Sequence, residues 1–165
     1  MMNPEYIDHF ITAAVSTFDA MLGCALTPQK MFTKVGLQPQ YEVSGVIGLS
    51  SKKARGTVVL SLSQEAALSA TGAMLGERPA QINADVTDAV GELTNIIAGA
   101  AKAKLEHLAL DLSLPMTVIG KNHMLGFPQD AISVCIPYGC AWGDLAVEVA
   151  LVEKAGQTQH DNDLF

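Results

Sequence analysis

Residues 85–107 constrain the fold more than any other part of the chain, because their periodicity predicts one long helix. Asp85 or Asn83 can cap the N-terminus of this helix, and Asp88 lies near the positive end of its dipole. Apolar side chains recur at steps of three and four and predict a stripe that faces the core, namely Val86, Ala89, Val90, Leu93, Ile96, Ile97, Ala100 and Ala101. The rest of the chain must therefore supply the layer against which this stripe packs.

A second stripe on the same helix is polar or small. It consists of Asp88, Glu92, Asn95, Gly99, Lys102 and Glu106, which follow one another at steps of 4, 3, 4, 3 and 4 residues. At about 100° per residue, these six positions fall within roughly 80° of one another. Glu92 and Asn95 are therefore neighbours that point away from the core. Gly99, one turn further on, leaves the surface open to close approach.

The residue types on this face are poor choices for a helix interior. Asn is a weak helix former, and Gly costs about 1 kcal/mol relative to Ala. Gly91 and Thr94 add two more weak formers in the same turns. One interpretation is a solvated surface that uses small residues for packing. The other is that Glu92 and Asn95 present a charge and an amide to a second molecule, and residue chemistry alone leaves both open.

The fifteen residues 88–102 resemble the signature helix of the CheC/CheX/FliY phosphatases of bacterial chemotaxis. That motif is a Glu-x-x-Asn on a helix, followed by an apolar pair and a small residue. Here it is Glu92-Leu-Thr-Asn95-Ile-Ile-Ala-Gly99. A bare Glu-x-x-Asn carries no information, but the longer context, the chain length and the order of elements agree with the family. Because only one such motif is present, the chain is more similar to CheX than to the two-site members.

The resemblance implies a phosphatase that hydrolyses the aspartyl phosphate of a CheY-type receiver domain without a covalent intermediate. In the family the Glu docks on a receiver lysine and the Asn positions the attacking water, roles that fall here on Glu92 and Asn95. Asp88, Gly99 and Lys102 share the face and are expected to touch the partner. The receiver supplies Mg²⁺, so we expect no cofactor in this chain. The alternative is a non-catalytic adaptor that binds a receiver or a flagellar switch component through the same face.

Composition excludes several other classes. The chain has 165 residues, 49% hydrophobic and 16% charged, which predicts a globular protein with a full core. A net charge of −7 leaves no basic stripe for nucleic acid, and no apolar run is long enough to span a membrane. We therefore expect a cytoplasmic protein with one domain over residues 1–154 and a polar, mobile tail over 155–165.

The cysteines and histidines do not predict a metal or nucleophilic centre. Cys24, Cys135 and Cys140 are odd in number, form no C-x-x-C and sit in apolar surroundings, so buried reduced thiols are expected. The histidines are His9, His107, His123 and His160, and they are scattered without ligand spacing. No metal site is expected, and no Ser-His-Asp or Cys-His arrangement has local support.

The other elements predict an α/β (α+β) fold in which long helices pack on one face of a mostly antiparallel sheet. We expect helices over 3–23 and 63–75, a loop over 24–39, and strands over 41–49, 56–62, 112–119, 131–138 and 145–152. The second pair of long strands, like the first, reads as a hairpin. Trp142 lies in or beside its turn.

This order of elements contains a faint repeat of a helix followed by a hairpin, and pseudo-duplicated halves are also what the resemblance implies. Aligning Gly23 with Gly99 places Ser16 opposite Glu92 and Asp19 opposite Asn95. The first helix therefore lacks the acid–amide pair. A single active face is expected.

Two further features have competing interpretations. Residues 131–136 carry no charge, so an open edge there would favour a homodimer, as in CheX relatives, whereas a place inside the monomer's own sheet would need no partner. The basic turn Lys52-Lys53-Ala54-Arg55 is interpreted as a solvated hairpin tip, with an anion site as the alternative. Asp111, Asp130 and Asp144 are expected to be solvated or to act as caps.

Overall fold

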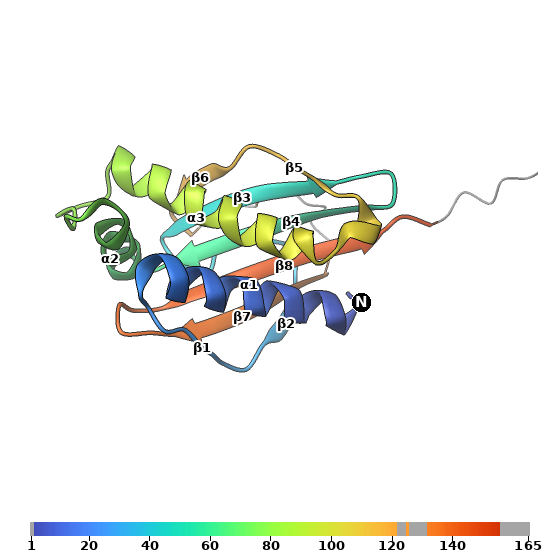
Figure 1. Ribbon diagram of the computed structural model, residues 1–165, viewed down its shortest axis with the longest axis horizontal. Coiled ribbons are helices and arrows are strands. Elements are labelled where there is room, and N and C mark those ends of the chain that lie inside the picture. Colours follow the sequence, from blue (N-terminus) through green and yellow to red (C-terminus); the bar gives the residue numbers. More distant parts are fainter. Residues whose placement is uncertain (1, 122–124, 126–131, 156–165) are drawn as a thin grey trace, which may run out of the picture.

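Three helices cover one face of an eight-stranded sheet in the computed structural model, which describes residues 2–121, 125 and 132–155 (Figure 1). The helices are α1 (Pro4–Leu22), α2 (Gln64–Leu75) and α3 (Ala84–Ala103), followed by the short 3₁₀ helix η1 (Glu106–Leu108). The strands are β1 (Thr27–Pro28), β2 (Phe32–Val35), β3 (Val43–Ser50), β4 (Ala54–Leu62), β5 (Asp111–Leu112), β6 (Met116–Ile119), β7 (Ile132–Gly139) and β8 (Leu145–Glu153). The predicted fold class is confirmed.

The sheet has the order β1-β7-β8-β4-β3-β5, with β2 also beside β7 and β6 also beside β3. Every pairing is antiparallel, and β4 meets β8 at the centre, where Val58 pairs with Val149. The expected duplication is visible in this order. Each long helix, α1 or α3, is followed by short strands and then by a hairpin. The short strands of each half pair with the hairpin of the other half.

The main core lies between the sheet and the helices, with α1 and α3 side by side above the central strands (Figure 1). Its largest fully buried side chains include Phe10, Phe18, Leu60, Leu93 and Ile97. On the opposite face, a smaller apolar cluster of Leu37, Val46, Val59, Leu125 and Ala150 covers part of the sheet. Here Lys34 of the edge strand β2 forms an ion pair with the buried Glu148 of β8. Burial raises the pKa of Glu148, and the Lys34 ammonium opposes that shift.

The predicted caps bound α1 and α2 at both ends and begin α3; for α2 they are Ser63 and Gly76. Asn3 accepts from the backbone N–H of Glu5 before α1, and Gly23 ends the helix with a φ of 62°. Asn83 is the N-cap of α3, where it accepts from the N–H of Val86. The predicted end of this helix at residue 107 is wrong.

The third helix stops at Ala103 because the chain must bury Leu105, Leu108 and Leu110 together. In a continuous helix Leu110 would lie about 140° from Leu105, on the solvent side. The turn at η1 instead brings all three into the core and leads the chain back to β5, which pairs with β3. Glu106, predicted on the polar stripe of the helix, therefore lies beyond its end.

The prediction of a loop over residues 24–39 is also wrong, because this segment contains β1 and β2. These strands are two and four residues long and mostly exposed, so they show no alternation of apolar and polar residues. The predicted strand 112–119 is divided into β5 and β6. Ser113, between the two, accepts through Oγ from the backbone N–H of Gly48, and Pro115 has no N–H to donate.

The strand proposed as an open edge lies inside the sheet. Cys135 of β7 pairs with Phe32 on one side and with Glu148 on the other. The expected edge at 131–136 is therefore wrong for the residues the structure describes, which exclude residue 131. Burial within the monomer's own sheet explains the uncharged run.

The three cysteines are free thiols, as predicted. Cys24 and Cys135 are buried and Cys140 is half-buried. Burial raises the pKa of Cys24 to about 11 and that of Cys135 to about 12, so both remain protonated near neutral pH. Low thiolate content makes them poor nucleophiles, which agrees with a packing role.

Candidate functional site on the third helix

The polar stripe of α3 faces away from the sheet, as the spacing predicted. Glu92 and Asp88 are exposed, and Asn95, Gly99 and Lys102 are half-buried. The opposite side of α3 is buried on the sheet through Val86, Val90, Leu93, Thr94, Ile97 and Ala101. Two residues predicted to face the core do not do so fully. Ile96 is half-buried and Ala100 is exposed, because both lie on the side of α3 that turns toward α1 and solvent.

Strand β6 fixes the other flank of α3. Thr117 donates through Oγ1 to the carbonyl of Thr87 at 2.8 Å. A Cβ on Gly91 would lie 3.4 Å from Thr117 Oγ1. Asn95 is one turn beyond Gly91 and so leans toward this side. Glu92 lies at the crest of the helix, the side that points directly away from the sheet. The acid–amide pair thus spans the crest and the β6 flank of α3.

The face continues past Asn95 into a hollow of about 500 Å³. Gly99 and Lys102 line it from α3, and Glu106 and Asp111 line it from the segment that follows the helix. The same hollow is closed by Ala103, Leu105, Ala109 and Leu110. All three predicted partner-binding positions therefore fall on the same face as the pair, with Gly99 and Lys102 at the hollow and Asp88 toward the other end of the helix.

Neither side chain of the pair is engaged by the protein itself. Within the described residues, the carboxylate of Glu92 and the amide of Asn95 form no hydrogen bond or ion pair. An amide offers one accepting oxygen and two donor hydrogens, and a carboxylate accepts only. The two groups are therefore available to a second molecule. Among the described residues, no group of three His, Cys, Asp or Glu side chains could hold a metal ion.

The weak helix formers of α3 have two different explanations. Thr94 is buried, donates through Oγ1 to the carbonyl of Val90 at 2.7 Å, and packs against Gly45 of β3. A Cβ on Gly45 would lie 1.9 Å from Thr94 Oγ1, so this pair sets how closely α3 approaches the sheet. Gly99 has no comparable reason, because a Cβ there would meet no atom within 4 Å.

Sequence reasoning missed the β5–β6 connection beside the pair. Leu114 is 90% exposed there, and Pro115 follows it against Gly91. An exposed apolar side chain thus lies next to the residue that packs on the β6 flank of α3. The available signal was Pro115, which interrupts the predicted strand 112–119.

The first helix lacks an equivalent pair. Ser16 and Asp19 are exposed on α1, and matching the two Asn caps instead would place Thr12 and Val15 opposite the motif. Both alignments leave α1 without an acid and an amide one turn apart.

If the motif face carries the receiver dephosphorylation that the resemblance implies, Ser16→Ala and Asp19→Ala should each change its rate by less than about twofold, because neither residue lies on that face. The measurement is the decay of receiver-bound phosphate with each variant. A loss as large as that from changing Asn95 would reveal a second working face.

Comparison with known proteins agrees with the geometry. The class defined by the fold and by the helix face is that of the CheC/CheX-like chemotaxis proteins. The model of the family described as "Chemotaxis phosphatase CheX" matches residues 43–139, more than half of the chain and including the whole of α3. The chain therefore belongs to the CheX chemotaxis phosphatase family.

Individual relatives extend over most of the chain. The CheY-P phosphatase CheX of Thermotoga maritima is 29% identical over 124 residues, 73% of this chain and 79% of that protein. The crystal structure of the chemotaxis protein CheX from Vibrio vulnificus is 31% identical, with a TM-score of 0.80 over 90% of this chain and 99% of that one. The CheX–CheY–BeF3–Mg²⁺ complex from Borrelia burgdorferi contains the same fold, with 24% identity, a TM-score of 0.67 and coverage of 91% and 98%.

Proposed function

We propose that this protein is a phosphatase that hydrolyses the aspartyl phosphate of a CheY-type receiver domain. The observation that carries the proposal is the unpaired Glu92 and Asn95, one turn apart on the outward face of α3 and within the family's matched region. The Thermotoga maritima relative bears the name of this activity, and the Borrelia burgdorferi complex pairs a protein of this fold with CheY. A cytoplasmic location goes with such a partner.

The chemistry demands little of the phosphatase beyond positioning. An aspartyl phosphate is an acyl phosphate, so water can displace the carboxylate directly once it lies in line with the breaking P–O bond. The water oxygen bonds to phosphorus, the carboxylate leaves with the electron pair, and the water proton passes to the phosphate or to solvent. No nucleophile of the phosphatase takes part, and no covalent intermediate forms.

Asn95 is the residue suited to hold the water. Its amide oxygen accepts a hydrogen bond from the water while the NH₂ group donates elsewhere, and its partial burial against the β6 flank limits its motion. Acceleration by a hundredfold to a thousandfold requires about 2.7–4 kcal/mol, which one well-placed amide in a closed site can supply.

Glu92 serves to dock the receiver. It stands exposed at the crest of α3, where its carboxylate can pair with the receiver's lysine and fix the register of the two proteins. The receiver also brings Mg²⁺, which stabilises the phosphoryl oxygens. Asp88, Gly99, Lys102 and the exposed Leu114 complete the docking surface.

The test is the decay of phosphate on a purified receiver, with and without this protein. Faster decay that scales with the protein concentration is the expected result. If the receiver binds but its phosphate decays at the intrinsic rate, the protein is an adaptor that uses the same face. If the receiver does not bind, both functions are excluded for that receiver.

Gly99→Ala is expected to change stability and receiver binding in opposite directions. Alanine at this position meets no atom of the protein and favours the helix, so the free energy of unfolding should rise by about 0.5–1 kcal/mol. The added methyl group should nevertheless weaken receiver binding, because it stands on the docking surface. Urea unfolding and a receiver titration measure the two effects.

Gly91→Ala is the matched control for that experiment. It makes the same change on the buried flank of the same helix, where the new Cβ would be in ordinary contact with Thr117 and Pro115. Receiver binding should be unaffected by it. Equal receiver affinity for Gly99→Ala and the unchanged protein would remove Gly99 from the docking surface.

We also propose that the protein forms a homodimer. The support is the resemblance to dimeric CheX relatives, together with exposed apolar side chains along β2 and its neighbours, namely Met31, Phe32, Val35 and Ile132. Sedimentation at micromolar concentration should show twice the mass of one 17.4 kDa chain. A single 17.4 kDa species would exclude the dimer and leave the phosphatase proposal intact, because α3 lies in another layer.

A further inference from the structure

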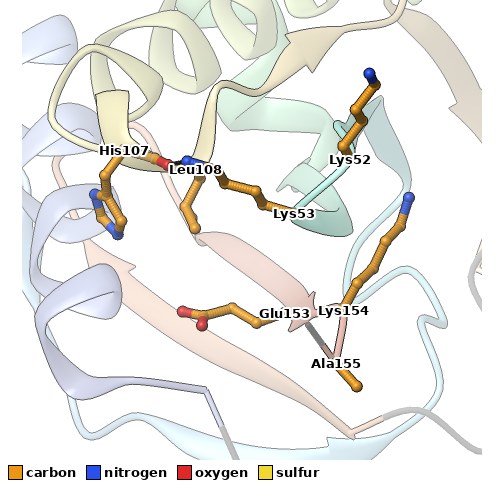
Figure 2. A pocket seen from close by; sticks show the side chains of 7 residues that line it. All are labelled: Lys52, Lys53, His107, Leu108, Glu153, Lys154 and Ala155. Atoms are coloured by element: carbon orange, nitrogen blue, oxygen red, sulfur yellow. Dashed lines mark hydrogen bonds between the residues drawn. The ribbon is translucent and has the colours of Figure 1, made fainter. Parts of the chain in front are cut away.

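Basic side chains gather around a second hollow, beyond the C-terminal end of α3 (Figure 2). Its volume is about 760 Å³, and three separate segments enclose it. The β3–β4 turn contributes Lys52 and Lys53, η1 contributes His107 and Leu108, and the end of β8 leads into Lys154 and Ala155. Only Glu153, among its lining residues, carries a carboxylate.

The lysines of this hollow are held by neutral groups. Lys53 donates through Nζ to the carbonyl of His107 at 2.9 Å, and Lys154 donates through Nζ to the carbonyl of Ser51 at 2.6 Å. Lys52 has no partner among the described residues. A main-chain hydrogen bond from the N–H of Lys154 to the carbonyl of Lys53 connects the turn to the end of β8. Three lysines therefore line one hollow, and none of them forms an ion pair with a described residue.

The chain as a whole is acidic. Acidic residues number 17 against 10 basic ones, so partners of opposite charge are abundant. Lys34, Arg78 and Lys121 each have one, in ion pairs with Glu148, Glu65 and Glu42. Like charges in one place cost free energy unless an anion joins them.

Glu153 does not act as the anion that neutralises these lysines. Its carboxylate accepts a hydrogen bond from the hydroxyl of Tyr6, which also contacts Nε2 of His107 at 3.0 Å. Figure 2 shows Glu153 extending toward the side of His107, while Lys52 and Lys154 extend the other way. The acid is thus engaged on the His107 side, away from the ammonium groups of Lys52 and Lys154.

We propose that this hollow binds a small anion that carries several negative charges, of the pyrophosphate or polyphosphate class. Each ammonium has three donors, and Lys53 and Lys154 each use one of theirs on a described residue. Three such groups around 760 Å³ offer more donors and more space than a single phosphate uses. Leu108 and Ala155 are the only apolar residues among the described residues that line the hollow, so charged and polar groups dominate its surface.

Calorimetric titration of the full chain with pyrophosphate, at constant ionic strength, tests the site. Saturable binding of one pyrophosphate per chain is expected. In Lys52→Gln/Lys154→Gln the affinity should fall at least tenfold, because two of the three ammonium groups are lost. Lys30→Gln/Lys104→Gln is the matched control, since both residues are exposed, lack partners among the described residues and change the net charge equally.

Three results would overturn the proposal. They are the absence of saturable binding, an unchanged affinity in Lys52→Gln/Lys154→Gln, and an equal loss in the two double variants, which would indicate a general charge effect. Receiver dephosphorylation by Lys52→Gln/Lys154→Gln should be unchanged, because the hollow shares no lining residue with the acid–amide pair. The proposals for the two sites can therefore be confirmed or rejected independently.

Discussion

Asn95→Ala is expected to slow receiver dephosphorylation by a hundredfold to a thousandfold while receiver binding and folding are retained. The side chain forms no hydrogen bond within the described residues, so its loss leaves no buried partner unsatisfied. Alanine is also the better helix former. What disappears is the amide that is proposed to position the water, and the decay of receiver-bound phosphate under single-turnover conditions measures its effect.

Glu92→Ala provides the contrast. Because Glu92 is proposed to dock the receiver, its loss should weaken receiver binding as well as the rate, and high receiver concentrations should restore part of the rate. Raising the receiver concentration should not rescue Asn95→Ala. Full activity in Asn95→Ala would remove the water-positioning role, and a binding defect in both variants would reduce the pair to a docking contact.

Gly45→Ala is expected to destabilise the protein by about 2–3 kcal/mol, which for a chain of this size lowers the melting temperature by roughly 5–10 °C. The new Cβ would lie 1.9 Å from Oγ1 and 2.9 Å from Cβ of Thr94, and 3.1 Å from the carbonyl oxygen of Val90. Since the last of these is backbone, α3 must lift from β3 to accommodate it. Thermal unfolding followed by circular dichroism measures the loss.

Two further variants identify the cause. Gly48→Ala lies on the same strand, where a Cβ would be 3.5 Å from Ser113 Oγ, and should cost little. Thr94→Ala in the Gly45→Ala background removes the closest contact and should restore part of the stability. If Gly45→Ala and Gly48→Ala were equally destabilised, loss of strand glycine itself would be responsible, and the close packing of α3 would not.

The helices could be predicted because their signals are local. Asn3, Pro4 and Gly23 bound the first helix, Ser63 and Gly76 bound the second, and Asn83 begins the third. Caps and turns of this kind involve residues two to four positions apart. The outward stripe of α3 was predictable for the same reason.

Features that depend on distant parts of the chain could not be predicted. The short strand β2 exists because it pairs with β7, and nothing in its own four residues alternates. The end of α3 is decided by the burial of Leu110, and the place of β7 by its two neighbours. At the site, the packing of Thr94 on Gly45 was equally invisible, so Thr94 was interpreted with Gly99 although only Gly99 lacks a packing role.

The crossing of short strands between the two halves has a consequence for biosynthesis. Phe32 pairs with Cys135, about one hundred residues later, and β6 of the second half pairs with β3 of the first. The first half therefore emerges from the ribosome with β2 unpaired, and a chain stopped after β4 would leave the central strand without β8. Contacts over such separations form late in folding. The sheet beneath the helices is consequently complete only after β7 and β8 have been made, so a chain still on the ribosome without them does not yet have the fold described here.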